Sequence, residues 1–207
     1  MDIKEKIILK ASQLFREKGI KGTSMDELAS SLGISKRTIY VNFEDKEHIL
    51  IQILNYQRKV RDNKFAEYLE KSENVIEVFL RLLDMFNEMP DTNPLFYEEI
   101  YKYYPNIFNS MTEVLQHDQK HLIAFFNMGI QQGMIRKDLN VEISAFIIGQ
   151  SSFKYMISTF LDKPEYSFKD IKYTMMTNFI RGISTEKGIK IVDAYLAEHQ
   201  KDNKDLN

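Results

Sequence analysis

Apolar residues recur at spacings of three and four along almost the whole chain of 207 residues, and no convincing alternating pattern interrupts them. This period is typical of one face of an α-helix and not of a strand. Only four prolines and eight glycines interrupt it. The sequence therefore predicts an all-α fold.

The first quarter of the chain predicts helices with clear boundaries. They span residues 2–18, 24–32, 36–42 and 46–69. Asp2, Ser24 and Ser35 stand where a polar side chain caps a helix N-terminus, and Gly19 and Gly33 stand where a left-handed residue ends one. The inward face of the first helix is expected to consist of Ile3, Ile7, Ala11, Leu14 and Phe15.

The rest of the chain predicts longer helices, which we expect to pack as a bundle. They span residues 74–89, about 95–104, 105–132, 141–161, 168–182 and 185–199, and no role is assigned to residues 185–207. We expect a small N-terminal domain at residues 1–48 and a larger helical domain at residues 49–207.

Residues 23–43 combine a helix, a one-glycine turn and a second short helix, which is the order of a helix-turn-helix. At 100° per residue, Ile39 and Phe43 share the side that faces the core, and Arg37, Thr38 and Val41 point roughly opposite. The short helix is therefore apolar behind and mainly polar in front, as a helix that enters a DNA major groove must be.

The polar residue types around this helix suit contacts with DNA. Lys36 and Arg37 carry the charges that reach guanine edges or phosphates, threonine meets a base edge or a thymine methyl, and Asn42 has the amide that pairs with adenine. The hydroxyl of Tyr40 is a donor for phosphate. Lys46 and the start of the helix at residues 24–32 are expected to add contacts with the DNA backbone. Free amides at a helix N-terminus attract phosphate.

At these residues the sequence resembles a known family. The segment GTSMDELASSLGISKRTIYVNFEDKEHIL, together with A-x-x-L-F-x-E-K-G-I before it, is similar to the signature of TetR-family bacterial regulators. The resemblance covers roughly residues 3–50. By position it implies DNA contacts at Thr23, Ser24, Ser35, Lys36, Arg37, Thr38, Tyr40, Asn42 and Lys46. Many relatives have Gly or Pro where Arg37 stands, so no relative's operator can be transferred to this chain.

The resemblance also implies a homodimer with a ligand-binding core, released from a palindromic operator by a small-molecule effector. Repression is the commoner behaviour in this family. By their order, helices 141–161 and 168–182 correspond to the pair that forms the family's dimer interface, and small residues such as Ser144 and Gly149 favour close helix approach. Two-fold pairing doubles the number of bases that one short helix reads.

The second part of the chain is rich in aromatic residues and methionines, as are pockets for apolar or aromatic ligands. An ordinary helical core has the same composition, so both interpretations stay open for each residue. The predicted pocket residues are Phe86, Phe96, Tyr104, Phe125, Met128 and Phe153.

Composition limits the other possibilities. The chain has no cysteine, which excludes disulfides and thiol catalysis, and it shows no phosphate loop or catalytic constellation, so we expect neither an enzyme nor a cofactor. His117 and His121 share a helix face, a spacing that surface histidines also show, and we predict no metal site. No apolar run approaches the length of a membrane span, so we expect a cytoplasmic protein that lies on the bacterial nucleoid when bound to DNA.

Charge gives only weak support to a DNA-binding function. The formal net charge is −2, and residues 1–50 contain 9 Lys and Arg against 8 Asp and Glu, a net charge of +1. A nucleic-acid-binding domain usually carries a stronger basic footprint. The alternative is a helical protein-interaction module in which the helix-turn-helix is vestigial.

Overall fold

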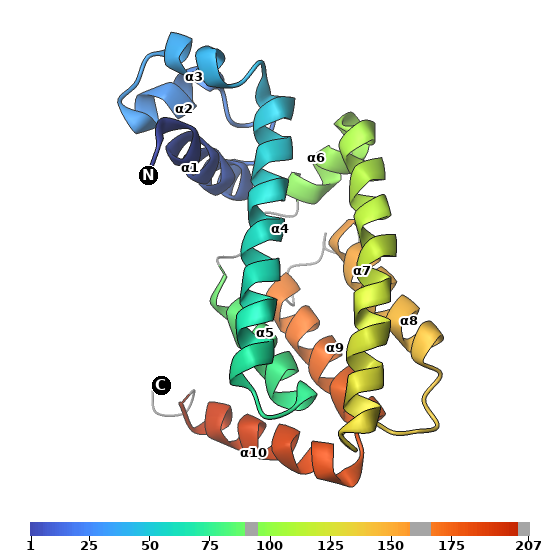
Figure 1. The fold of residues 1–207 in the computed structure, drawn as a ribbon. Helices are drawn as coiled ribbons and strands as arrows, with labels where there is room; N and C mark the ends of the chain where they lie inside the picture. Colours follow the sequence, from blue (N-terminus) through green and yellow to red (C-terminus); the bar gives the residue numbers. More distant parts are fainter. Residues whose placement is uncertain (90–94, 158–166, 203–207) are drawn as a thin grey trace. The chain divides into compact units, whose positions relative to one another are not determined.

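The computed structural model describes residues 1–89, 95–157 and 167–202, which are helical almost throughout, as the apolar spacing predicts. Figure 1 shows the ten helices of these ranges. They are α1 (Ile3–Lys18), α2 (Met25–Leu32), α3 (Lys36–Asn42), α4 (Lys46–Lys71), α5 (Val75–Glu88), α6 (Leu95–Tyr103), α7 (Pro105–Gln131), α8 (Val141–Ile157), α9 (Phe168–Ile183) and α10 (Glu186–Asp202). Across the same ranges, none of these helices has the length and apolar character to cross a membrane.

Local capping contacts fix several helix boundaries. The Asp2 carboxylate accepts a hydrogen bond from the Glu5 amide at 2.9 Å, which confirms the predicted start of α1. The Asn74 side chain accepts from the amides of Ile76 and Glu77 at the start of α5. Gly19 ends α1 with a positive φ of 80°, but its ψ of 166° lies outside the left-handed helical region, so that part of the prediction was wrong.

The described residues form two compact units. The first contains residues 1–62, 95–112 and 156–157, and the second contains residues 63–89, 113–155 and 167–202. Helices α4 and α7 contribute residues to both. These are packing units, and the functional division at residue 48 stays a prediction.

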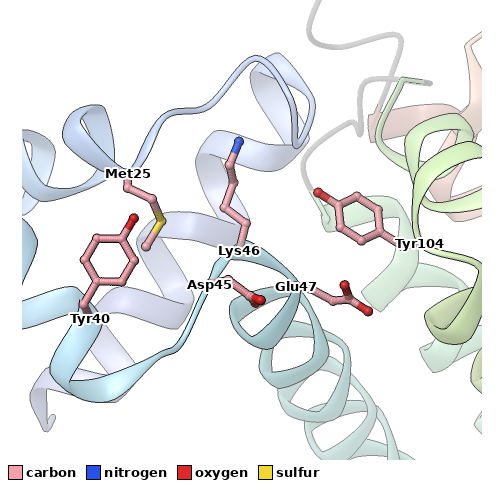
Figure 2. Close-up of a pocket in the computed structure, with 6 residues that line it drawn as sticks. All are labelled: Met25, Tyr40, Asp45, Lys46, Glu47 and Tyr104. Atoms are coloured by element: carbon pink, nitrogen blue, oxygen red, sulfur yellow. The ribbon is translucent and has the colours of Figure 1, made fainter.

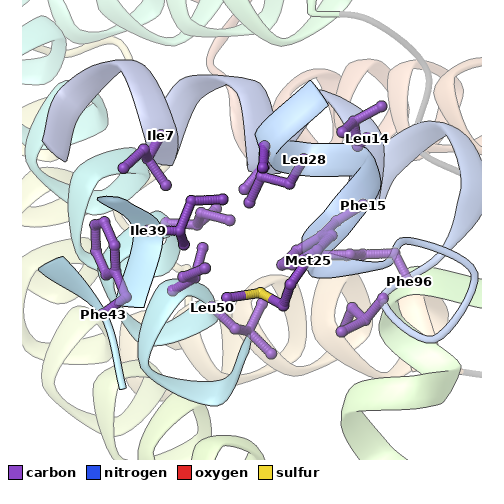
Figure 3. Close-up of a cluster of buried hydrophobic side chains, with 14 of the residues drawn as sticks. Ile7, Leu14, Phe15, Met25, Leu28, Ile39, Phe43, Leu50 and Phe96 are labelled. Atoms are coloured by element: carbon purple, nitrogen blue, oxygen red, sulfur yellow. The ribbon is translucent and has the colours of Figure 1, made fainter. Parts of the chain in front are cut away.

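The core of the first unit gathers apolar side chains from α1, α2, α3, α4 and α6 (Figure 3). The labelled members in Figure 3 are Ile7, Leu14, Phe15, Met25, Leu28, Ile39, Phe43, Leu50 and Phe96. Ile3 was expected on the same face, but it is 36% exposed at the first residue of α1. The core thus supports the back of the two helices that form the predicted motif.

A separate core holds the second unit together. Its buried residues include Val75 and Ile76 of α5, Phe125 and Phe126 of α7, Ala145 and Ile148 of α8, Ile180 and Ile183 of α9, and Val192 of α10. Gly129 allows α7 to approach α5 closely, since a Cβ there would lie 2.7 Å from a Val75 methyl group. An isolated antiparallel bridge between Ile135 and Ser184 joins the segments that precede α8 and α10.

Candidate nucleic-acid interface

The two helices of the motif are joined by a turn that local hydrogen bonds determine. The Ser24 hydroxyl accepts from the Glu27 amide at 3.0 Å and starts α2. Gly33 ends α2 in the left-handed conformation, with φ 65° and ψ 30°. The Ser35 hydroxyl then accepts from the Thr38 amide at 3.0 Å and starts α3. All three features follow the sequence prediction, and together they fix the direction in which α3 leaves the turn.

Two apolar residues hold α3 from behind. Ile39 is fully buried and Phe43 nearly so, as predicted from their spacing. The Phe43 ring also packs edge-on against His48 at the start of α4, with 5.6 Å between ring centroids. The opposite side of α3 therefore faces away from the apolar core.

The outward face of α3 carries three protruding side chains. Arg37 is exposed, Tyr40 is 48% exposed and Val41 is 77% exposed. Arg37 and Val41 lie four residues apart and therefore stand one above the other on the same side of the helix. The guanidinium of Arg37, the phenol of Tyr40 and the two methyl groups of Val41 thus form the outermost surface of this motif.

Other predicted contact residues make hydrogen bonds within the motif. The Lys36 ammonium bonds to the Asp26 carboxylate at 2.9 Å, a contact that raises the pKa of Lys36. The Asn42 amide donates to the Thr38 carbonyl oxygen at 2.7 Å. The hydroxyls of Ser35 and Thr38 lie 2.8 Å apart and share a hydrogen bond. DNA must compete with these contacts to engage the same groups.

Thr23 and Lys46 hold the turn between α1 and α2. Thr23 is only 1% exposed, and its hydroxyl donates to the Gly19 carbonyl oxygen at 3.0 Å. The Lys46 ammonium donates to the carbonyl oxygens of Ile20 and Thr23 at 2.9 and 2.7 Å. The Thr23 side chain therefore points inward, and Lys46 uses two of its three donors on the backbone of this turn. The DNA contacts expected at Thr23 and Lys46 stay predictions.

Helix α6 supplies a contact that the sequence did not indicate. The Glu99 carboxylate accepts hydrogen bonds from the backbone amides of Ile20 and Lys21, the second at 3.0 Å. The Lys21 ammonium lies 3.2 Å from the centre of the Tyr103 ring. Glu99 is 78 or more residues from its partners, so no local pattern signals it. Its carboxylate and the Lys46 ammonium secure the amides and carbonyls of one short loop.

An open pocket of about 340 Å³ lies beside the motif (Figure 2). Its lining residues are Met25, Tyr40, Asp45, Lys46, Glu47 and Tyr104. Burial and then the nearby Glu99 carboxylate raise the pKa of Tyr104, so its hydroxyl stays protonated. Two carboxylates and one ammonium group line this hollow, and among the predicted ligand-pocket residues only Tyr104 lies in it.

The residues predicted to line that ligand pocket have several different environments. Phe96 is buried in the first core, and Tyr104 packs against its edge. Phe125 is buried in the second core, where its ring meets Phe65 edge-on at 5.7 Å. Met128 is 39% exposed on α7, and its place in a ligand pocket stays a prediction.

Two further residues, Phe86 and Phe153, were predicted to line the ligand pocket. Phe86 is half-buried, with the Lys172 ammonium 3.7 Å from its ring centre. The side chains of Phe153 and His117 lie outside the described residues. Within the described part of the chain, no group of three or more His, Asp or Glu side chains is arranged to hold a metal ion.

Comparisons with known proteins agree with this geometry. Residues 7–53 match the family described as bacterial regulatory proteins, tetR family. The chain is 30% identical over 186 residues to the uncharacterized HTH-type transcriptional regulator YuxN of Bacillus subtilis (strain 168). That match covers 89% of this chain and 53% of YuxN, so the chain spans about half the length of this relative.

A second relative and one solved structure extend the similarity beyond the N-terminal segment. The chain is 24% identical over 194 residues to the biofilm operon icaADBC HTH-type negative transcriptional regulator IcaR of Staphylococcus aureus (strain Newman), covering 86% of this chain and 100% of that protein. The fold is similar to a putative transcriptional regulator from Saccharomonospora viridis in complex with choline. The TM-score is 0.70 at 19% identity, over 88% of this chain and 98% of that one.

Proposed function

The chain belongs to the TetR family of bacterial regulatory proteins, and from this premise we propose that it is a transcriptional repressor that a small molecule releases from DNA. The related IcaR is named a negative regulator, which supports repression over activation. As a DNA-bound regulator it would act in the bacterial cytoplasm.

The observation that carries this proposal is the asymmetry of α3. Its back is fixed by Ile39 and Phe43, and its front presents Arg37, Tyr40 and Val41. A short helix with a rigid apolar anchor and a protruding front fits the major groove of B-DNA. A structural corner with no ligand would have no need of such a front.

We assign each DNA contact from the chemistry and exposure of the side chain. Arg37 has the planar fork that pairs with guanine O6 and N7. Tyr40 donates its hydroxyl to a phosphate, and Lys36 leaves Asp26 for a phosphate when DNA arrives. Ser24 and Ser35 are exposed at helix starts, where backbone amides face outward.

Thr23 and Lys46 act indirectly in this proposal. They hold the turn before α2 in place, through the hydrogen bonds to Gly19, Ile20 and the Thr23 carbonyl described above. The start of α2, and with it the phosphate anchor at Ser24, depends on that turn.

A dimer would present two copies of α3 to one operator. On α8, Ile143, Phe146 and Ile147 are about half exposed on one face, opposite the buried Ala145 and Ile148. An exposed apolar stripe of this kind marks a protein interface. We therefore propose that α8, together with α9, pairs with the same helices of a second copy, as the sequence order suggests for residues 141–161 and 168–182.

The effector would bind in the second unit, whose core packs aromatic side chains such as Phe125 and Phe126 against each other. The similar regulator from Saccharomonospora viridis is described in complex with choline, which supports a small organic effector for this fold. Helix α4 belongs to both units, with Ile49 and Ile53 in the first core and Tyr68 and Leu69 packed against the second. Effector binding would shift α4, and a difference in effector affinity between the two states of about 1–3 kcal/mol would lower DNA affinity.

Selection from random duplex DNA tests the proposal. The purified full chain is incubated with the pool, and retained duplexes are sequenced after several rounds. We expect an enriched palindrome whose half-sites are about one helical turn apart. Weak, salt-sensitive retention without an enriched sequence would contradict the proposal and favour the protein-interaction module.

A further inference from the structure

One highly exposed residue on the outer face of α3 is apolar. Val41 is 77% exposed, more than any other large hydrophobic residue of the described chain. It was not among the residues predicted to contact DNA. Single exposed apolar residues are ordinary on protein surfaces, and what distinguishes Val41 is its place on α3 and its neighbours.

Helix propensity argues against valine at this position for structural reasons alone. Branched side chains lose rotamer freedom in a helix, and α3 has only seven residues in which to offset that loss. Burial offsets the same loss at Ile39, which is fully buried. Val41 has no comparable burial in the protein, and a contact outside the protein would supply it.

The neighbours of Val41 indicate which chemical group it would contact. Arg37 lies one turn before it on the same face, and the more polar flanks are occupied by internal contacts, Lys36 with Asp26 and Asn42 with the Thr38 carbonyl. A guanidinium followed one turn later by a branched apolar group matches the edge of a guanine followed by the methyl group of a thymine. That methyl is the one apolar group that base pairs present in the major groove.

We propose that Val41 is a specificity-determining residue that reads the C5-methyl group of a thymine in each operator half-site. This inference rests on the proposed function. Four residues of helix span about 6 Å, which corresponds to about two base-pair steps. The thymine therefore lies within about two base pairs of the guanine that Arg37 reads.

Replacement of thymine by deoxyuridine tests this contact, because it removes one methyl group and leaves base pairing unchanged. In the enriched palindrome, each thymine is replaced symmetrically in both half-sites, and the dissociation constant is measured by fluorescence anisotropy. A lost methyl contact weakens binding about fourfold per half-site, so about fifteenfold for the symmetric pair. We expect this loss at one thymine position per half-site.

The Val41→Ala variant identifies the protein partner of that methyl group. Alanine favours the helix, and the position is exposed, so the variant folds. With Val41→Ala the deoxyuridine penalty at the sensitive position should fall to about twofold or less, while penalties elsewhere stay unchanged. Ile51→Ala, at another exposed branched residue, is the matched control and should keep the full penalty.

The outcomes separate this inference from the function on which it rests. An equal penalty in wild type and Val41→Ala, or no sensitive thymine in a duplex that is bound specifically, overturns the role of Val41 and leaves the repressor proposal intact. Failure to enrich any duplex in the first place rejects the proposed function and the inference together.

Discussion

The helix-turn-helix and the second unit are stabilised in different ways. In the first, short polar contacts define almost every boundary, from the Ser24 and Ser35 caps to the Lys46 and Glu99 contacts with one loop. In the second, broad apolar faces pack against each other around a core drawn from α5, α7, α8, α9 and α10, while Asn74, Ser167 and Thr185 cap or join helices. There the Tyr195 hydroxyl donates to Asp84, and burial followed by that carboxylate raises the pKa of Tyr195.

This difference suggests a division of labour. Hydrogen bonds are directional, so a loop held by several of them keeps one geometry, as a surface that reads DNA requires. Apolar packing tolerates rearrangement better when side-chain volume is conserved. A unit built mainly on apolar contacts can therefore take up a ligand by repacking, while the reading surface stays intact.

The largest effect should come from the second unit, although it does not contact DNA in this account. Phe146→Glu places a charge on the exposed stripe of α8 and should convert the proposed dimer to a monomer. Loss of paired binding should weaken operator affinity by about a hundredfold or more. Analytical ultracentrifugation and anisotropy measure the two effects. Ala197→Glu, at an exposed position of α10, adds the same charge and should change neither.

A smaller effect should follow from removing the cation that holds the α1–α2 turn. Lys46→Met leaves the carbonyl oxygens of Ile20 and Thr23 without their donor and should lower the free energy of unfolding by about 2 kcal/mol. Urea denaturation measures this loss, and Lys59→Met, at an exposed lysine of the same helix, should lack it.

The same variant distinguishes the internal role of Lys46 from the phosphate contact that the sequence suggested. An internal clamp predicts an unchanged slope of log affinity against log salt. Unchanged stability together with a slope reduced by about one would show that Lys46 neutralises a phosphate instead.

The smallest effect concerns an exposed ion pair on the motif. The hydrogen bond from Lys18 lowers the pKa of the Glu27 carboxyl group. This pair therefore stabilises the folded state above the ordinary glutamate pKa, and the contribution is lost as pH falls through the lowered folded value. The difference in urea midpoint between wild type and Glu27→Gln should be small near neutral pH and should vanish in acid. A difference that grows in acid would contradict this sign.

The sequence predicted local features far better than distant ones. Asp2, Ser24, Ser35 and Gly33 act within three or four residues of their own positions, so their caps and turn were found directly. Glu99 acts on residues about 80 positions away, and no spacing rule reaches that far.

The direction of polar side chains was the weakest part of the sequence prediction. Asn42, Lys46 and Thr23 have residue types that suit DNA, but each makes a hydrogen bond inside the first unit. The aromatic residues were equally ambiguous, because Phe96 and Phe125 fill cores with the same chemistry that lines a pocket. Residue type thus limits the possible roles, and the partner within reach decides among them.

The central claim is that the outer face of α3 carries sequence specificity, and parallel selections test it most directly. Wild type and Arg37→Ala are each used to enrich duplexes from the same random pool. We predict that wild type enriches a palindrome with a guanine at one symmetric position, and that Arg37→Ala enriches the same palindrome with that position randomised. Identical motifs from both proteins would show that specificity lies elsewhere and would contradict the account.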